Sequence, residues 1–530
     1  MKNELLENAV AGLDEELVES TRDMTKIRKR GAYRRAALLA AAVLMLAGAG
    51  LFAHGLLSGI EPEKPSVEPA DTAEESKSGP HAGTPGNYSV ALAKYPEMPG
   101  MEKLVKLQAE LKALADSTLD AAEKMRQEEE LLKEYAACQK AILAEQDSLR
   151  ADGVEEAYQK ILEAYTERTA EKLFLENRGD NVLFSPASLY LDLCMLAETV
   201  KGDARDELLM LTGLKDIGES RKLSDSIFRN LYRTDASGQT FPADSVWLNA
   251  GTAFRESAVK ELAAWHRADV FSVPMGTAEA DAVLKEWISG RTGHLLKDAV
   301  EKIETSDIPQ VLLVSTLFYS DSWWTRFSKE LTAKGTFSSA SGNAAEADFM
   351  HTASVDGYVR GENYTIAALP MESGGSMVFL LPDEDTSLSE LTREGLVASA
   401  LMKWQDGEER PQADIRWSVP KFEVSADLSM VETLKQLGIQ KVFLPGEADF
   451  TPLFDSPGDG RCVSSIRQAG CVRINEDGCE AASYTLIGIT DTLSPEVSEQ
   501  RIEMDLNRPF AFMITGVRGL PLFIGLVNTL

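Results

Sequence analysis

A run of small residues near the C-terminal end constrains this chain more than any other feature. The turn-forming sequence Asn475-Glu-Asp-Gly478 is followed by Cys-Glu-Ala-Ala-Ser-Tyr-Thr, residues 479–485. These side chains are too small to anchor a hydrophobic core, yet they can be accommodated in a β-strand. A segment of this kind suits a loop that lies outside the fold and can later enter a sheet. A polar stretch follows it and ends at Asn507-Arg-Pro-Phe510.

Length, charge and cysteine content exclude several classes of protein. The chain has 530 residues, of which 44% are hydrophobic, so it can bury a large core and carry additional segments. Its formal net charge of −30 argues against a nucleic-acid partner, because phosphate binding requires a basic face. The five cysteines predict no disulfide framework, and the spacing of Cys462, Cys471 and Cys479 fits no usual zinc pattern.

Enzyme motifs are equally missing from the sequence. It contains no GxSxG nucleophile motif, no P-loop and no GxGxxG that opens a helix, and none of the five histidines lies in an HExxH motif. We therefore expect a protein that is not an enzyme, with no catalytic residue, no metal and no cofactor.

The first 60 residues have the pattern of a membrane anchor. Residues 1–35 hold eight Lys or Arg and seven Asp or Glu residues, and the basic ones gather at the end of this segment. Residues 36–60 carry no charge apart from His54, and 25 residues are enough to cross a bilayer as a helix. We expect 1–35 to be cytoplasmic, 36–60 to be a single transmembrane helix, and the remainder to be extracellular. A cleaved secretion signal is the alternative, which the length of both segments disfavours.

Two further segments precede the main domain. Residues 61–99 are rich in Pro, Glu, Ser, Thr and Gly without apolar periodicity, which predicts a disordered tether. Residues 100–154 predict a helical spacer, because leucines recur at spacings of three and four residues. This spacer could be a coiled-coil stalk that binds a protein partner, a helical hairpin packed on the neighbouring domain, or a solvated spacer. Interruptions of the heptad pattern favour the last two.

The largest domain is expected over residues 155–530. It opens with an amphipathic helix over 158–177, after which strand-like and helical runs mix without a strict βαβ alternation. The strand-like runs are residues 246–249, 311–314, 377–381 and 414–419. Such mixing predicts an α+β fold with large, mostly antiparallel sheets.

This domain resembles the serpin family through motifs that occur in the family's order. They are Asn181-Val-Leu-Phe-Ser-Pro-Ala-Ser188, Val200-Lys-Gly202, Leu211-Thr-Gly-Leu214, Trp287-Ile-Ser-Gly-Arg-Thr-Gly-His294, residues 314–323, Leu380-Leu-Pro-Asp383, Pro420-Lys-Phe422, Leu437-Gly-Ile439, Ala448-Asp-Phe450, Asn507-Arg-Pro-Phe510 and Phe523-Ile-Gly-Leu-Val-Asn528. The match covers about 375 residues. The resemblance implies a serpin fold with surrounding helices and an exposed reactive-centre loop.

The resemblance also implies a mechanism. A protease cuts the exposed loop and forms an acyl-enzyme. The cut loop then enters the main sheet as a new strand, and the trapped protease loses its catalytic geometry. The target protease is thus the expected partner.

The reactive loop can be assigned residue by residue on this basis. The expected hinge residues are Glu476, Gly478, Cys479, Ala481, Ala482 and Ser483. Because strand residues alternate, Cys479, Ala481, Ser483 and Thr485 would point inward, while Glu480, Ala482 and Tyr484 would face solvent. The inward residues are small and uncharged, so they would not block entry.

The sequence leaves two candidates for the scissile bond and indicates an altered sheet opening. Two alignments of the loop place the cut at Asp491-Thr492 or at Thr492-Leu493. Trp323 and Ser315 are expected where the sheet opens. Ser315-Thr316 stands where the family has Asn-Ala, and Gln468-Ala469 where it has His-Lys, so we expect a latch of different construction.

The sequence thus predicts a suicide inhibitor of extracytoplasmic serine or cysteine proteases, anchored in the cell membrane by one helix. The anchor pattern would suit a bacterial surface. Two alternatives stay open, namely a non-inhibitory serpin-like binding module and a surface adhesion protein that uses residues 100–154.

Overall fold

The structure is a computed structural model of the 530-residue chain. It describes residues 88–96, 100–115, 117, 119–150, 153–235, 237–292, 301, 303, 305, 311–406, 410–455, 460–463, 465–479 and 500–530. The expected cytoplasmic segment and transmembrane helix, residues 1–60, lie outside the described residues. In the part that is described, no helix combines the length and the apolar character that crossing a bilayer requires.

One of the two sheets is mixed, and its strands come from distant parts of the chain. Its order is β1 (Ser89–Ala91), β5 (Ala268–Val273), β4 (Gly238–Asn249), β6 (Val311–Ser322), β14 (Gly478–Cys479), β13 (Ile466–Ile474) and β12 (Phe422–Ser429), with β3 (Arg233–Thr234) paired to β4. We call this sheet A. The neighbours β4–β5 and β6–β13 are parallel, and the other described pairs are antiparallel.

A second sheet packs beside sheet A. Its order is β15 (Arg501–Asp505), β11 (Gln412–Pro420), β8 (Ala344–Arg360), β9 (Tyr364–Pro370), β10 (Ser376–Pro382), β16 (Phe510–Thr515), β17 (Pro521–Val527) and β2 (Val182–Phe184), with β7 (Ala333–Ser338) paired to β8. Only β11–β15 is parallel among its described pairs. All four strand-like runs of the sequence lie inside strands, so the prediction of an α+β fold with mostly antiparallel sheets is confirmed.

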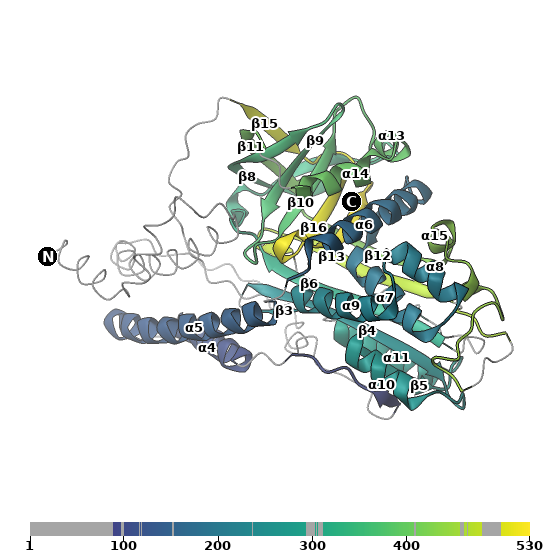
Figure 1. The fold of residues 1–530 in the computed structure, drawn as a ribbon. Coiled ribbons are helices and arrows are strands. Elements are labelled where there is room, and N and C mark those ends of the chain that lie inside the picture. The colour runs from purple at the N-terminus through teal and green to yellow at the C-terminus, as the bar shows by residue number, and fades with distance from the viewer. Residues whose placement is uncertain are drawn as a thin grey trace. The chain divides into compact units, whose positions relative to one another are not determined.

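Helices pack against the two sheets and against one another (Figure 1). They are α6 (Glu156–Glu176), α7 (Pro186–Thr199), α8 (Asp203–Thr212), α9 (Ile217–Leu231), α10 (Glu256–Trp265), α11 (Ala278–Arg291), α13 (Leu388–Arg393), α14 (Leu396–Lys403) and α15 (Val431–Gln436). Every residue of α7 is buried, including the carboxyl-bearing side chains of Asp192 and Glu198. Ser185 caps this helix by accepting a hydrogen bond from the Ser188 N–H (3.3 Å), and Pro186 occupies its first turn.

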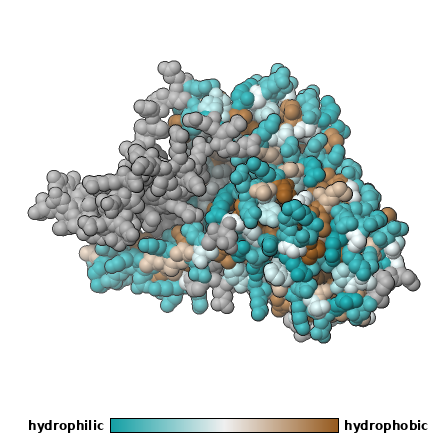
Figure 2. All heavy atoms as spheres, viewed as in Figure 1, coloured by the Kyte–Doolittle hydropathy of each residue, from teal (hydrophilic) through white to brown (hydrophobic). Residues whose placement is uncertain are grey.

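The two faces of sheet A pack against different cores. One face, with α7 behind it, belongs to the main hydrophobic core shared with the second sheet. The other face packs against α11, where Trp287 and Leu284 join Phe318 and Val314 of β6 in a smaller core. In the view of Figure 1, the exterior is mostly hydrophilic with apolar residues gathered in patches (Figure 2).

The structure corrects our expectation of a disordered tether over residues 61–99 at its C-terminal end. Ser89–Ala91 form β1, which pairs with β5 at the edge of sheet A. The Ala93 N–H then donates to the carboxylate of Asp269 (3.0 Å), and the Tyr95 ring lies 4.8 Å from that of Phe241. These apolar and polar contacts bind the segment to the sheet, which the Pro- and Ser-rich composition did not indicate.

The predicted helical spacer contains two antiparallel helices, α4 (Met101–Ala115) and α5 (Ala121–Leu149), which we call the hairpin. Leu104 and Leu107 of α4 pack against Cys138 and Ile142 of α5. The C-terminal end of α5 contacts the body, because the Gln146 side chain donates to the Thr234 carbonyl (2.5 Å). Of the alternatives that the sequence left open, the structure shows a hairpin packed on the neighbouring domain at one end.

Candidate functional site

The hinge begins with a tight turn that the sequence itself encodes. The side-chain oxygen of Asn475 accepts hydrogen bonds from the N–H groups of Asp477 (2.9 Å) and Gly478 (3.2 Å). The Asn475 N–H also donates to the Gly478 carbonyl (3.0 Å), which closes the turn. Asparagine and glycine are the residues that turns of this type favour. The turn reverses the chain so that β14 can enter the sheet next to β13.

Glycine is required at position 478 by a close approach of two backbones. A Cβ atom there would lie 2.1 Å from the Asp321 carbonyl oxygen. Gly478 and Cys479 pair with Ser322 and Asp321 of β6, and Cys479 also pairs with Ile474 of β13. The first two residues of the expected hinge strand therefore already lie between β6 and β13.

Cys479 occupies an inward position in this short strand. Its side chain is 3% exposed and belongs to the main core. Among the described residues, no group of His, Cys, Asp or Glu side chains is placed to hold a metal ion. None of the five cysteines, all of which are described, forms a disulfide. The burial of Cys479 shows which face of β14 points to the main core.

Glu476 is anchored on three sides although it lies in a turn. Its carboxylate accepts a hydrogen bond from Thr332 (2.8 Å) and pairs with Lys421 (2.7 Å), while its carbonyl accepts from the Phe327 N–H (3.1 Å). Burial alone would raise the pKa of Glu476, but the hydrogen bonds from Lys421, the backbone and Thr332, together with the charge of Lys421, outweigh it and lower the pKa. The carboxylate is thus held ionised directly before the hinge strand.

Trp323 lies under the turn, as expected for a residue at the sheet opening. Its indole N–H donates to the Asn475 carbonyl (2.8 Å), and its backbone N–H donates to the Asp477 carbonyl (3.1 Å). The ring is 1% exposed and meets Phe327 edge to face, with the ring centroids 5.9 Å apart. Trp323, Glu476, Gly478 and Cys479 therefore form one site, which we call the hinge end.

Ser315 lies elsewhere, about 20 Å along β6 from the hinge pairs, at ~3.3 Å per strand residue. It pairs with Gln468 at the point where β6 and β13 are direct neighbours, a ladder of three residue pairs beginning at Leu313 and Ile466. The structure thus separates the two residues that we had grouped as one sheet-opening region. We call the ladder between β6 and β13 the latch end.

Side chains behind the ladder hold the latch end closed. Gln468 accepts a hydrogen bond from the Ser185 N–H (2.7 Å) and donates one to the Ser185 carbonyl (2.9 Å). Ser315 donates to the buried carboxyl of Asp192 (2.7 Å). Burial raises the pKa of Asp192 to about 7, although the hydrogen bond from Ser315 opposes this rise. The pKa of the Asp244 carboxyl is also raised, mainly by burial and secondly by the negative charge of Asp192.

Sequence reasoning missed an ion network beside the hinge. The guanidinium of Arg233 contacts Asp235 through two hydrogen bonds (2.6 and 2.8 Å) and lies 3.3 Å from a carboxylate oxygen of Asp321. All three side chains are at most 6% exposed. Asp321 is the residue that pairs with Cys479. Ser320-Asp321 stands where the serpin pattern that this sequence resembles has Lys-Gly, and this departure is the one signal of the network in the sequence.

The structure also corrects the environment of the expected outward face. We predicted that Ala482 and Tyr484 would face solvent after insertion. On that face of β6, however, Phe318 and Val314 are 5% and 8% exposed and pack in the core formed with α11. An inserted strand would be covered on both faces at this level.

The remaining loop positions lie outside the described residues. They are Ala481, Ala482, Ser483, Asp491, Thr492 and Leu493. The chain is described again from Gln500, and β15 begins at Arg501 beside β11. The two ends of the loop are therefore fixed in different sheets.

Comparisons with known proteins agree with this geometry. A sequence model of the family described as serpin (serine protease inhibitor) matches residues 162–530. Serpin-ZXA of Oryza sativa subsp. japonica is 29% identical over 366 residues, which is 66% of this chain and 91% of the relative. Serpin-ZX of Arabidopsis thaliana is 27% identical, over 66% of this chain and 92% of the relative.

Solved structures show the same fold. The thermophilic serpin tengpin in its native state superposes with a TM-score of 0.62 at 23% identity, covering 71% of this chain and 95% of its own. Arabidopsis AtSerpin1 in its native stressed conformation gives a TM-score of 0.61 at 23% identity, with 70% and 98% covered.

Proposed function

This chain belongs to the serpin family, whose members are generally protease inhibitors, and we propose that it traps a protease by inserting its own cleaved loop into sheet A. The observation that carries the proposal is the register at the hinge. Cys479 is paired with β6 and β13 at once, so the strand that would be extended by insertion has already started.

The register fixes where each loop residue would go. Cys479 pairs with Asp321 of β6, and each further residue would pair one position earlier along this antiparallel strand. Thr485 would then lie beside Ser315 and Gln468, which are paired with each other before insertion. Residues 480–484 could enter before the latch end separates, and every residue after them would require it to open.

Alternation assigns the faces of the inserted strand. Cys479 points into the main core, so Ala481, Ser483 and Thr485 would do so too. None of these side chains is charged or large, and burying them would cost little. The driving force would come from new main-chain hydrogen bonds on both sides of the strand together with apolar burial.

The test compares one inward with one outward position in the same loop. We expect the wild-type protein to form a complex with an active serine protease that survives denaturing gel electrophoresis. Ser483→Arg would bury a charge in the main core and should turn the protein into a cleaved substrate with no such complex. Glu480→Gln is the control in the same loop, because it introduces no new charge into the inserted strand, and it should leave the complex in place.

The proposal has two clear points of failure. Loop cleavage of the wild-type protein without any covalent complex, across serine and cysteine proteases, would contradict inhibition and favour the non-inhibitory binding module. Equal complex yields for Ser483→Arg and the wild-type protein would contradict the register. Cleavage sites identified by mass spectrometry would decide between Asp491-Thr492 and Thr492-Leu493.

We further propose that residues 36–60 anchor the chain in a membrane and that the serpin domain acts on the extracellular side. The support for this setting is the uninterrupted apolar stretch with a basic segment before it. Protease added to intact cells should release the serpin domain, and protection from it would reverse the orientation. The bacterial source that we expected has no support from the relatives, which are plant proteins.

A further inference from the structure

The hairpin lies outside the matched serpin region. The C-terminal end of α5, where the hairpin contacts the body, is next to the hinge end. Besides the bond from Gln146 to Thr234, Arg150 donates to the Tyr232 carbonyl (3.1 Å). These two carbonyls flank Arg233, which contacts Asp321 opposite Cys479. Figure 1 shows the hairpin running away from the body at the end of sheet A where β3 lies. The extra helices are thus fixed to the end of the molecule from which the reactive loop starts.

The hairpin is long enough to reach a protease at the loop. The 29 residues of α5 span about 43 Å at 1.5 Å per residue. A protease domain of about 230 residues has a diameter of about 45 Å, from the usual relation between chain length and radius of gyration. Since α5 contacts the body near its C-terminal end, the free length of the hairpin is about that of a protease held at the loop.

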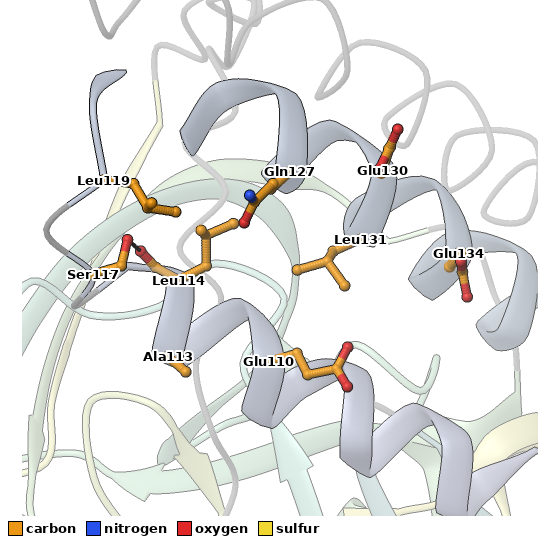
Figure 3. A pocket seen from close by; sticks show the side chains of 9 residues that line it. All are labelled: Glu110, Ala113, Leu114, Ser117, Leu119, Gln127, Glu130, Leu131 and Glu134. Carbon is orange, nitrogen blue, oxygen red and sulfur yellow. Dashed lines mark hydrogen bonds between the residues drawn. The ribbon is translucent and has the colours of Figure 1, made fainter. Parts of the chain in front are cut away.

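A groove of about 480 Å³ lies between the helices near that far end. Its lining residues are Glu110, Ala113, Leu114, Ser117, Leu119, Gln127, Glu130, Leu131 and Glu134. Leu114, Leu119 and Leu131 point into the space between α4 and α5 (Figure 3). Leu119 and the neighbouring Met125 are each 43% exposed. The groove therefore has an apolar floor and three carboxylates in its lining.

This combination suits a long side chain with an apolar stem and a cationic end, which describes Lys and Arg. Glu134 and Glu110 are paired at the surface with Lys103 (3.0 Å) and Lys106 (3.7 Å). Exposed pairs of this kind contribute about 0–1 kcal/mol, so an incoming cation can replace the internal lysines. A second copy of this chain, with its net charge of −30, would be repelled instead.

We propose that the hairpin is a second contact for the target protease, whose surface presents a Lys or Arg side chain to the groove. The inference rests on the proposed inhibitory function and names the recognition step that precedes cleavage. The contact would hold the protease only while the loop is outside sheet A. Insertion would carry the scissile bond toward the latch end and away from the hairpin, so the contact would affect the rate of association and not the final trapping.

The test reverses the groove charges in the full-length protein. The variant carries Glu110→Lys, Glu130→Lys and Glu134→Lys, and the matched control carries Glu156→Lys, Glu256→Lys and Glu432→Lys. The control glutamates are exposed helical residues that also pair with a lysine three or four positions away, and the change in net charge is the same. Subtilisin and pancreatic elastase serve as probes, each as active enzyme and with its nucleophilic serine replaced by alanine.

For at least one probe, we expect the groove variant to lower the second-order rate of complex formation about tenfold at low salt, with a smaller loss at 0.5 M NaCl. The stoichiometry of inhibition of the groove variant should equal that of the wild-type protein. Non-covalent binding of the inactive protease should weaken in parallel. Ala113→Trp, which fills the groove without a charge change, should also slow association.

Three outcomes would overturn the proposal. They are equal rates for the groove and control variants with both probes, a change in stoichiometry without a change in rate, and self-association of the full-length protein that depends on the groove glutamates. Binding to the inactive protease is measured apart from covalent trapping. A wild-type protein that binds through the groove but forms no covalent complex would contradict the proposed function and leave the groove contact standing.

Discussion

The hinge end and the latch end close the same seam between β6 and β13, but with different chemistry. At the hinge end, ionised groups are paired, as Glu476 is with Lys421 and Asp321 with Arg233. At the latch end, Gln468 and Ser315 make hydrogen bonds to Ser185 and to a buried carboxyl whose pKa is raised. Ion pairs lie beside β14, while hydrogen bonds hold together the strands that would separate in the proposed insertion.

This difference suits a sheet that opens in one direction. Removing one partner of a buried ion pair leaves an uncompensated charge, which is a large cost. Exchanging one set of neutral hydrogen bonds for another costs little, because an entering strand supplies new donors and acceptors. We therefore expect the contacts at the hinge end to be retained during the proposed insertion, and the hydrogen bonds at the latch end to be exchanged for new ones. The following predictions test this contrast, beginning with the largest effect.

Arg233→Met should have the largest effect on stability. It leaves Asp235 and Asp321 buried without their cation, which typically costs about 3–5 kcal/mol. The measurement is the free energy of unfolding from chemical denaturation. Arg416→Met, which removes a surface pair with Asp414, is the matched control and should cost less than about 1 kcal/mol. Similar losses for both variants would contradict a special role for the hinge network.

Gln468→Met should destabilise the latch end by about 1–3 kcal/mol. The buried Ser185 N–H would lose its partner, whereas the Ser185 carbonyl would keep the hydrogen bond from the Leu189 N–H (3.2 Å). The variant should also convert more rapidly to a state with the uncut loop inserted, seen as a rise in thermal stability after incubation. Gln440→Met, at an exposed position, is the control. If the latch variant retained wild-type stability, Gln468 would not be part of the latch.

Asp192→Asn should change how stability depends on pH. Burial raises the pKa of Asp192 to about 7, so the folded protein holds a proton that the unfolded chain has released above about pH 4. Wild-type stability should therefore fall as the pH rises from about 4 to about 7. Relative to the wild-type protein, the variant should gain about 1.4 kcal/mol per pH unit over this range. A difference that does not vary with pH would contradict a protonated Asp192.

Lys421→Met should give the smallest effect, with the opposite sign of pH dependence. The pKa of Glu476 is lowered in the folded protein, so its contribution is present at neutral pH and is lost as the pH falls below about 4. Because Lys421 is 35% exposed, we expect a loss of about 1 kcal/mol at pH 7 and a smaller loss at pH 3. An equal loss at both pH values would show that packing, and not charge, accounts for it.

Local sequence patterns predicted the hinge end better than the latch end. The Asn475–Gly478 turn and the inward position of Cys479 follow from turn chemistry and strand alternation, which operate over a few residues. Asp192 and Ser315 are 123 positions apart and meet only in the fold. No pattern within α7 marks Asp192 as the partner of a strand residue.

The same limit explains the other corrections. Tyr484 was expected to face solvent because alternation assigns a face but does not say what covers it, and α11 comes from another part of the chain. The strand at Ser89–Ala91 was missed because its partner β5 lies about 180 residues further along the chain. The family motifs, by contrast, predicted the overall architecture because their order spans the whole domain.

The short strand β1 has a consequence for how copies of this protein behave when they are crowded together. The outer edge of β5 would otherwise present unpaired N–H and C=O groups, and such an edge recruits strands from other molecules. Residues 89–91 occupy it from within the same chain, and the buried Asp269 fixes the segment through the Ala93 N–H. The sheet into which we propose that the loop inserts therefore ends on this side in a very short strand, which offers foreign strands little edge to pair with.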